Sequence, residues 1–161
     1  MTDITYIRTM EDFAYLAVVL DLYSRHVVGW SMQSRQTTDV ALQALHRAIW
    51  RRKTKSSVLI HSDQGSQSTS IDWVAFIRSH NLEHSMSRRE NCRDYDVAES
   101  FFNLFKRERI RRFIYKPREE ARQDVSDYIE MFYNPIRTHV RNGMLLPVEF
   151  ERQQAAIAQG V

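Results

Sequence analysis

The chain has 161 residues, a length that fits one domain with a real hydrophobic core. Hydrophobic residues make up 43% of it and charged residues 27%, and no run of about eighteen apolar residues exists, so we expect no transmembrane helix. The opening "MTDITYIRTM" lacks a basic segment followed by an apolar one, so we expect no secretion signal. The single cysteine, Cys92, excludes an intramolecular disulfide and suits a cytoplasmic protein.

The net charge is +3 with a pI near 9.2, and the basic residues gather at 51–53, 88–89 and 106–112. Such clusters fit a surface that binds phosphates, because that attraction is electrostatic and insensitive to sequence. They equally fit a solvated protein face. Charge alone leaves both interpretations open.

Three strands open the predicted fold. Segments 3–9, 13–24 and 25–33 are rich in Val, Tyr, Leu and Trp, which suit a pleated surface. Short polar breaks separate them, so the sequence predicts an antiparallel meander.

A helical period follows at 37–53, where Val40 and Leu45 fall on one apolar stripe and Thr37 or Thr38 is available as the N-cap. A fourth strand is predicted at 57–60, a second helix at 71–81 and a fifth strand at 82–86.

Two further helices are predicted at 97–113 and 118–134, and residues from about 135 to 161 are expected to form a C-terminal docking tail that frays. Strands and helices in this order predict an α/β fold. Its five-stranded mixed sheet, with three antiparallel and two further strands, is flanked by helices. Ligands in such sheets bind beyond the strand ends where the strand order switches.

Three carboxylates are placed to meet there. Asp63 ends the fourth strand, Asp3 lies near the start of the first, and Glu99 follows Asp63 with 35 residues between them. Convergent carboxylates repel one another unless a hard cation lies between them, and Mg²⁺ prefers such oxygen ligands. Two ions about 4 Å apart can activate an attacking oxygen and stabilise a leaving one in a phosphodiester displacement.

Each carboxylate also has an ordinary structural interpretation. Asp63, before Gln64 and Gly65, fits a turn, and Asp3 fits an exposed terminus. Glu99 stands three residues after Asp96, the spacing of a capping box. The catalytic interpretation therefore depends on the three residues as a set.

The chain resembles the catalytic domain of insertion-sequence transposases whose second reading frame encodes a retroviral-integrase-like core. The resemblance runs almost end to end and is carried by "TDITYI" at 2–7, "YLAVVLDLYSRHVVGW" at 15–30, "HSDQGSQ" at 61–67, "SMSR" at 85–88, "DVAESFFNLFK" at 96–106, "YIEMFYNPIRTH" at 128–139 and "LLPVEFE" at 145–151. Several motifs in fixed order make a strong signal.

The resemblance implies a ribonuclease-H-like fold and a single integrase catalytic core domain over residues 1–161. It assigns both catalysis and metal binding to the triad Asp3, Asp63 and Glu99, with two Mg²⁺ or Mn²⁺ ions, and it makes Asp21 a structural acid. The helical DNA-binding regions that family members carry before the core are absent from these residues. The implied enzyme is a DDE polynucleotidyl transferase that cuts and joins DNA at element ends.

Six residues are candidates for DNA contact. Asn103 and Lys106 lie four and seven positions beyond Glu99 on one helical face, although a solvated face fits the same pattern. Arg88 and Arg89 belong to a basic cluster, and the resemblance adds Arg137 and His139, although His139 also fits a structural role. Expected partners are DNA and, by the resemblance, a second copy of the chain, with no membrane and a cytoplasmic, nucleoid-associated place in a bacterium.

The sequence departs from the family pattern just before Glu99. The family has a glycine, "NC", an aromatic residue and "DNA" where this chain has "ENCRDYD" at 90–96, and Ser68 replaces a usual tyrosine. The extra acids at 90 and 96 are expected to raise the pKa of Glu99 by like-charge repulsion or to disturb the loop. Two alternatives stay open: an inactive transposase remnant that only binds DNA or a partner transposase, and a plain ribonuclease-H-like nuclease.

Overall fold

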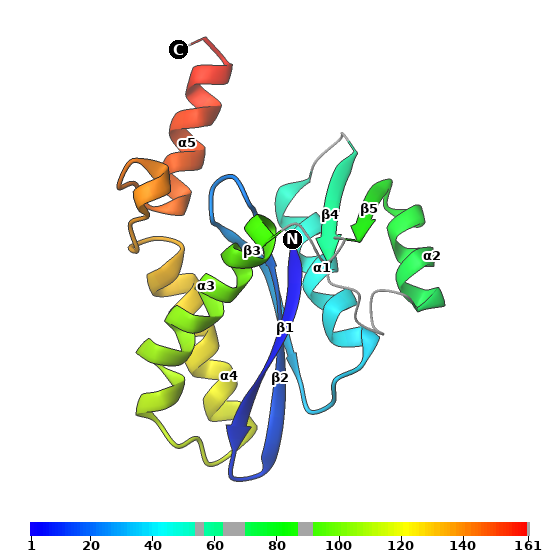
Figure 1. The fold of residues 1–161 in the computed structure, drawn as a ribbon, viewed down its shortest axis with the longest axis vertical. Coiled ribbons are helices and arrows are strands. Elements are labelled where there is room, and N and C mark those ends of the chain that lie inside the picture. The colour runs from blue at the N-terminus through cyan, green and yellow to red at the C-terminus, as the bar shows by residue number, and fades with distance from the viewer. Residues whose placement is uncertain (54–56, 63–69, 87–91, 161) are drawn as a thin grey trace.

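The computed structural model describes residues 1–53, 57–62, 70–86 and 92–160. Its first three strands form an antiparallel sheet in the order β1-β2-β3 (Figure 1), with bounds β1 Thr2–Thr9, β2 Asp12–Leu20 and β3 Val27–Gln33. The register pairs Asp3 with Val18 and Thr9 with Asp12, so only two residues connect β1 to β2. The predicted meander is confirmed.

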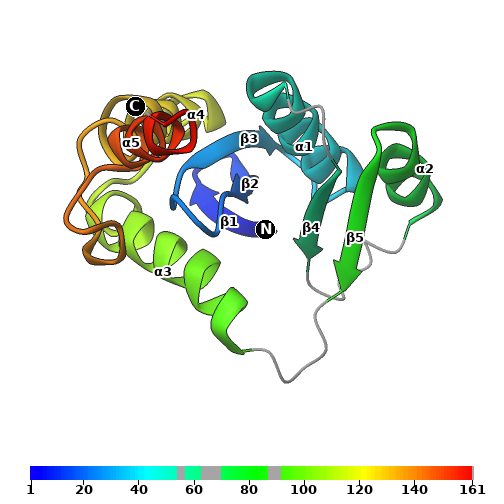
Figure 2. The ribbon, with the colours of Figure 1, turned by 90° about the horizontal axis from the view of Figure 1, so that it is seen from above.

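The other two strands run parallel to each other. They are β4 Val58–Ser62 and β5 Leu82–Met86. They are hydrogen-bonded as a separate pair, and β4 lies beside β1 in both ribbon views (Figures 1 and 2). The fourth strand extends two residues beyond the predicted 57–60, so it ends immediately before residue 63.

The helices are α1 Thr38–Arg52, α2 Ile71–Ser79, α3 Cys92–Glu108, α4 Arg118–Ser126 and α5 Pro147–Ala158. Short 3-10 turns occupy Ile110–Arg112 and Val140–Asn142, and a π-helical segment, Asp127–Tyr133, continues α4. No helix within these described parts of the chain is long and apolar enough to cross a bilayer.

Helices cover both faces of the β1-β2-β3 sheet (Figure 2). The alternating side chains of β2 divide between two cores, because successive residues of a strand point to opposite faces. Leu16 and Val18 pack with α3, α4 and the π-helical segment. Ala17 and Val19 pack with α1 and with Ile60 of β4.

Gly29 of β3 lets α1 approach the sheet closely. A Cβ atom at this position would lie 2.2 Å from the carbonyl oxygen of Ala44 and 2.7 Å from the backbone nitrogen of Ala48. Any larger residue would therefore push α1 away from β3. Thr37 is the N-cap residue of α1, one of the two that the sequence predicted. Its hydroxyl donates to Gln33 and accepts no N–H of the helix.

Two predicted helices differ in detail. The helix predicted at 97–113 begins at Cys92 and ends at Glu108, where the chain turns into a 3-10 segment. The helix predicted at 118–134 continues as a π-helix after Ser126. Within this π-helical segment Tyr128, Ile129 and Tyr133 are all buried in the core.

The C-terminal tail forms a helix, whereas the sequence predicted a segment that frays. Pro147 stands in the first turn of α5, where its missing N–H costs nothing. Glu151 then fastens α5 to the body: its carboxylate accepts from Ser24, His26 and Arg52. These bonds, and burial opposing them, leave the pKa of Glu151 at about 2, so it is charged at neutral pH. The far end of α5 extends away from the body (Figure 1).

Candidate active site

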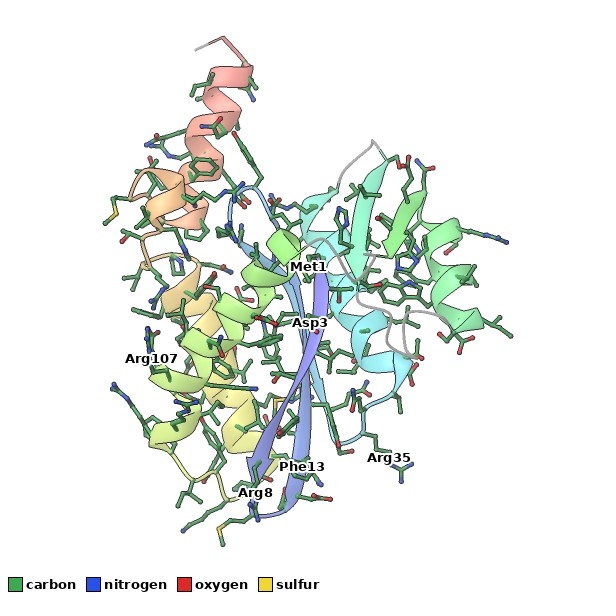
Figure 3. The ribbon with its side chains drawn as sticks, viewed as in Figure 1. Met1, Asp3, Arg8, Phe13, Arg35 and Arg107 are labelled. Carbon is green, nitrogen blue, oxygen red and sulfur yellow. The ribbon has the colours of Figure 1, made fainter. Side chains whose placement is uncertain are left out.

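Asp3 lies in β1 on the sheet face that packs against α3. It shares that face with Ile7, which contacts the core built by Phe101 and Phe105 of α3. The carboxylate is half-buried, and its Oδ1 accepts the backbone N–H of Ile4 at 2.7 Å. Figure 3 labels Asp3 near the start of β1.

Asp63 lies outside the described residues, but the strand before it is described. β4 lies beside β1 and ends at Ser62, level with the start of β1 (Figure 1). Ser62 is 2% exposed, and its Oγ lies 2.7 Å from Nε2 of His84 on β5. Burial lowers the pKa of His84, and nearby His61 lowers it further. This bond ties the end of β4 to β5.

Glu99 is exposed on α3, beside the buried face of the helix. Ala98 and Phe102 are buried in the core, whereas Glu99 and Asn103 are exposed. Lys106, on the same helical face as Glu99, places its Nζ 5.5 Å from the ring centroid of Tyr6 on β1. This face of α3 therefore borders β1, the strand that carries Asp3.

The other DNA-contact candidates fall into three groups. Arg88 and Arg89 lie outside the described residues. Arg137 is held by Glu108, whose two carboxylate oxygens each lie 2.7 Å from Nη1 of the guanidinium. His139 lies edge-on to Tyr133, with ring centroids 5.1 Å apart. DNA contact by all six residues stays a prediction.

His139 is in an unusual environment. Burial first, and then the positive charges of Arg137 and Arg25, lower its pKa to about 4. Its Nε2 is buried and has no hydrogen-bond partner among the described residues. The imidazole is therefore neutral at neutral pH and keeps one unused polar atom.

Two features escaped sequence reasoning: the bond between Ser62 and His84, and the placement of Arg25 and Arg141 in one pocket with His139. The strand "LEHSM" gave no sign that His84 would contact Ser62 on β4. Arg25 and Arg141 stand far apart in the chain, so no local pattern joins them.

The oxygen ligands that the sequence singles out suit a hard divalent cation. Asp3 offers a half-buried carboxylate and Glu99 an exposed one, and such groups prefer Mg²⁺ or Mn²⁺ over softer metals. Within the described ranges, which omit Asp63, no three metal-ligating side chains gather. The two described carboxylates therefore fit such a metal in chemical type.

Two models of one protein family match this chain, one over its N-terminal part and one over its C-terminal part. A family model described as integrase core domain matches residues 1–92, and a second model of the same description matches residues 99–154. Transposase InsF for insertion sequence IS3fB of Escherichia coli (strain K12) is 47% identical over 96% of this chain and 54% of its own length. The transposase for insertion sequence element IS904 of Lactococcus lactis subsp. lactis is 38% identical over 93% of this chain and 59% of its own length. The chain thus spans about half the length of these relatives.

Solved structures share the fold at low sequence identity. The HTLV-2 integrase catalytic core domain, determined in complex with magnesium, superposes with a TM-score of 0.68 at 16% identity, covering 92% of both chains. The catalytic domain of Mos1 mariner transposase gives 0.61 at 14% identity, covering 81% of this chain and 69% of that one. The predicted ribonuclease-H-like α/β fold is confirmed. From its sequence relatives and the two matching models, this chain belongs to the integrase core domain family.

Proposed function

We propose that residues 1–161 form one catalytic core domain of a DNA transposase, a DDE polynucleotidyl transferase. It cuts a phosphodiester at an element end and joins the freed 3′-OH to a second phosphodiester. One observation carries the proposal: β1, which bears Asp3, lies between β4, which ends immediately before Asp63, and α3, which bears Glu99. Two carboxylates on adjacent elements, with a third directly after a neighbouring strand in sequence, suit a metal-dependent phosphoryl transfer.

The relatives support the same reaction class. Two proteins similar in sequence are named as transposases of insertion sequences, and the HTLV-2 core was determined with magnesium. We extend this chemistry to the present chain as a divalent-metal requirement met by two Mg²⁺ or Mn²⁺ ions. Bound there, such ions supply Lewis acidity for the charge that develops on the phosphate oxygens.

The chain's own residues would position the metal and the DNA. Asp3 and Asp63 would hold the first ion and Glu99 would complete the second. The half-buried position of Asp3 limits its motion, which favours a fixed ligand geometry. Asn103 and Lys106, on the helical face of Glu99, would meet the phosphate backbone beside the carboxylates.

We also propose the cellular setting implied by this function. The chain binds DNA and pairs with a second copy of itself. It is located in a bacterial cytoplasm, associated with the nucleoid. The relatives come from Escherichia coli and Lactococcus lactis. A dimer is in keeping with the dimeric form in which the HTLV-2 core was solved.

The test is a titration of the chain with Mg²⁺ and Mn²⁺, followed by a nicking and strand-transfer assay. Asp63→Asn removes a proposed ligand, so we expect metal affinity to fall at least tenfold and cleavage to disappear. Asp72→Asn, which removes an exposed acid in the first turn of α2, is the matched control and should leave both unchanged. A wild-type chain that binds no metal at millimolar concentration would identify it as an inactive transposase remnant.

A further inference from the structure

A second site lies next to α3, in a pocket of about 320 Å³. It is lined by Val97 and Ser100 of α3, by the turn between β2 and β3, and by the π-helical segment and the 3-10 turn that follows it. The polar groups around it are Arg25, Ser100, Tyr133, His139 and Arg141, and no described carboxylate lines it. We call these residues the arginine pocket.

A hydrogen bond from a side chain to the backbone holds the segments of the two arginines near each other. Asn142, which follows Arg141, donates from Nδ2 to the carbonyl oxygen of Ser24, which precedes Arg25, at 2.7 Å. Asn142 is 2% exposed and Ser24 is 1% exposed. This buried bond joins two segments that lie side by side (Figure 1). The fold itself therefore brings the two arginines close together.

The turn that presents Arg25 is organised by Asp21. Its Oδ1 accepts from the backbone N–H groups of Tyr23 at 2.8 Å and Ser24 at 3.1 Å, and its carbonyl accepts from Arg25 at 2.9 Å. Arg25 itself has a φ of +66°, the left-handed region that glycine or asparagine adopts more easily.

Among the described residues, the pocket has no counter-charge. Arg25 and Arg141 make no ion pair with a described residue. Burial lowers the pKa of Arg25, and the second cation, Arg141, lowers it further. Nε2 of His139 is buried without a partner among the described residues, and in the tautomer that protonates this atom it donates a hydrogen bond. Two guanidinium forks, an imidazole and a hydroxyl match the oxygens of a phosphate.

We propose that the arginine pocket binds one backbone phosphate of the DNA on which the catalytic carboxylates act. The inference rests on the proposed function, because it takes its ligand from that reaction. Val97 and Ser100 line the pocket and flank Glu99 within one helical turn, a rise of about 5.4 Å. A phosphate held there would fix the position of the DNA strand relative to the catalytic carboxylates.

The test measures binding of a labelled DNA duplex by fluorescence anisotropy in Ca²⁺, at several salt concentrations. Arg25→Gln and Arg141→Gln should each raise Kd about fivefold. The double variant should lower the salt slope by only about one, because both arginines hold the same phosphate. Arg78→Gln, which removes an exposed arginine at the end of α2, is the matched control and should change neither value. Thermal unfolding confirms that each variant is folded.

Two results would overturn the proposal. One is a DNA affinity in both arginine variants equal to that of the Arg78→Gln control. The other is a pair of observations: inorganic phosphate raises the Tm only when both arginines are present, and DNA binding does not depend on them. That result would make free phosphate the ligand. The proposed function can fail separately. If the wild-type chain never nicks DNA but the arginine variants bind DNA more weakly, the phosphate site stands and the catalytic function is wrong.

Discussion

Arg137 and Arg25 act on the same two side chains but have opposite surroundings. Both lower the pKa of His139, and the charges of both act on Tyr133. Arg137 is bound by both carboxylate oxygens of Glu108, which also accepts from the hydroxyl of Tyr128 at 2.9 Å. Arg25 is half-buried in the arginine pocket with a second cation beside it.

The difference separates an arginine that holds the fold from one that is available to a ligand. Glu108 lies at the end of α3 and also accepts from Tyr128 of the π-helical segment, so the ion pair of Arg137 joins α3 to the segment that follows the π-helix. Arg25 joins nothing through its side chain among the described residues. A paired charge has already exchanged its water for a partner, whereas an unpaired one gains most when an anion arrives.

Breaking the pair at Glu108 should give the largest effect. Glu108→Gln leaves Arg137 half-buried without a counter-charge, so we expect the free energy of unfolding to fall by about 2 kcal/mol in urea titrations. It also gives Arg137 the unpaired state of Arg25, so DNA affinity should rise two- to threefold. A stable variant with unchanged DNA affinity would contradict the comparison.

The matched control is Glu149→Gln on α5. Glu149 and Arg152 form an exposed pair at 2.7 Å, and pairs of this kind contribute little to stability. The free energy of unfolding should therefore change far less in Glu149→Gln than in Glu108→Gln.

Protonation of His139 should give the next largest effect. Its folded pKa of about 4 lies below its ordinary value, so the unfolded chain binds the proton more readily. The contribution of the neutral imidazole to the free energy of unfolding is complete above pH 6.5 and is lost as the pH falls towards 4. Because the side chain is only partly buried, we expect a loss on the order of 1 kcal/mol. Urea unfolding at pH 7 and pH 5 should show this loss in the wild type and a smaller one in His139→Gln.

The fold was predictable where the pattern is local. Alternating residues of β2 and the apolar stripe of α1 each identify their element because one face packs on the core. The turn between β2 and β3 was predicted but begins earlier than expected, directly after Leu20. Apolar Leu22 and Tyr23 extend the strand pattern, but the carboxylate of Asp21 accepts the N–H groups that close the turn. Helix α5 was missed because its anchor, Glu151, finds partners more than ninety positions away.

The functional residues also divide into those that a local sequence pattern predicts and those that only the folded chain brings together. Asp3, Asp63 and Glu99 stand out because their spacing and neighbouring motifs can be read along the chain. The arginine pocket has no such signal: the bond that assembles it joins Asn142 to Ser24, 118 positions apart. Only the folded chain brings its two arginines to one place.

Replacing Arg25 by asparagine should give the smallest effect and the sharpest test of the comparison. Asparagine adopts the left-handed conformation more easily than arginine, and the substitution removes a half-buried charge that has a like charge beside it. We therefore expect Arg25→Asn to raise the free energy of unfolding by about 0.5 kcal/mol while DNA binding weakens. Arg137→Asn should do the reverse for stability, because it removes a paired charge. A loss of stability in Arg25→Asn would mean that this arginine supports the fold, and the distinction between the two would fail.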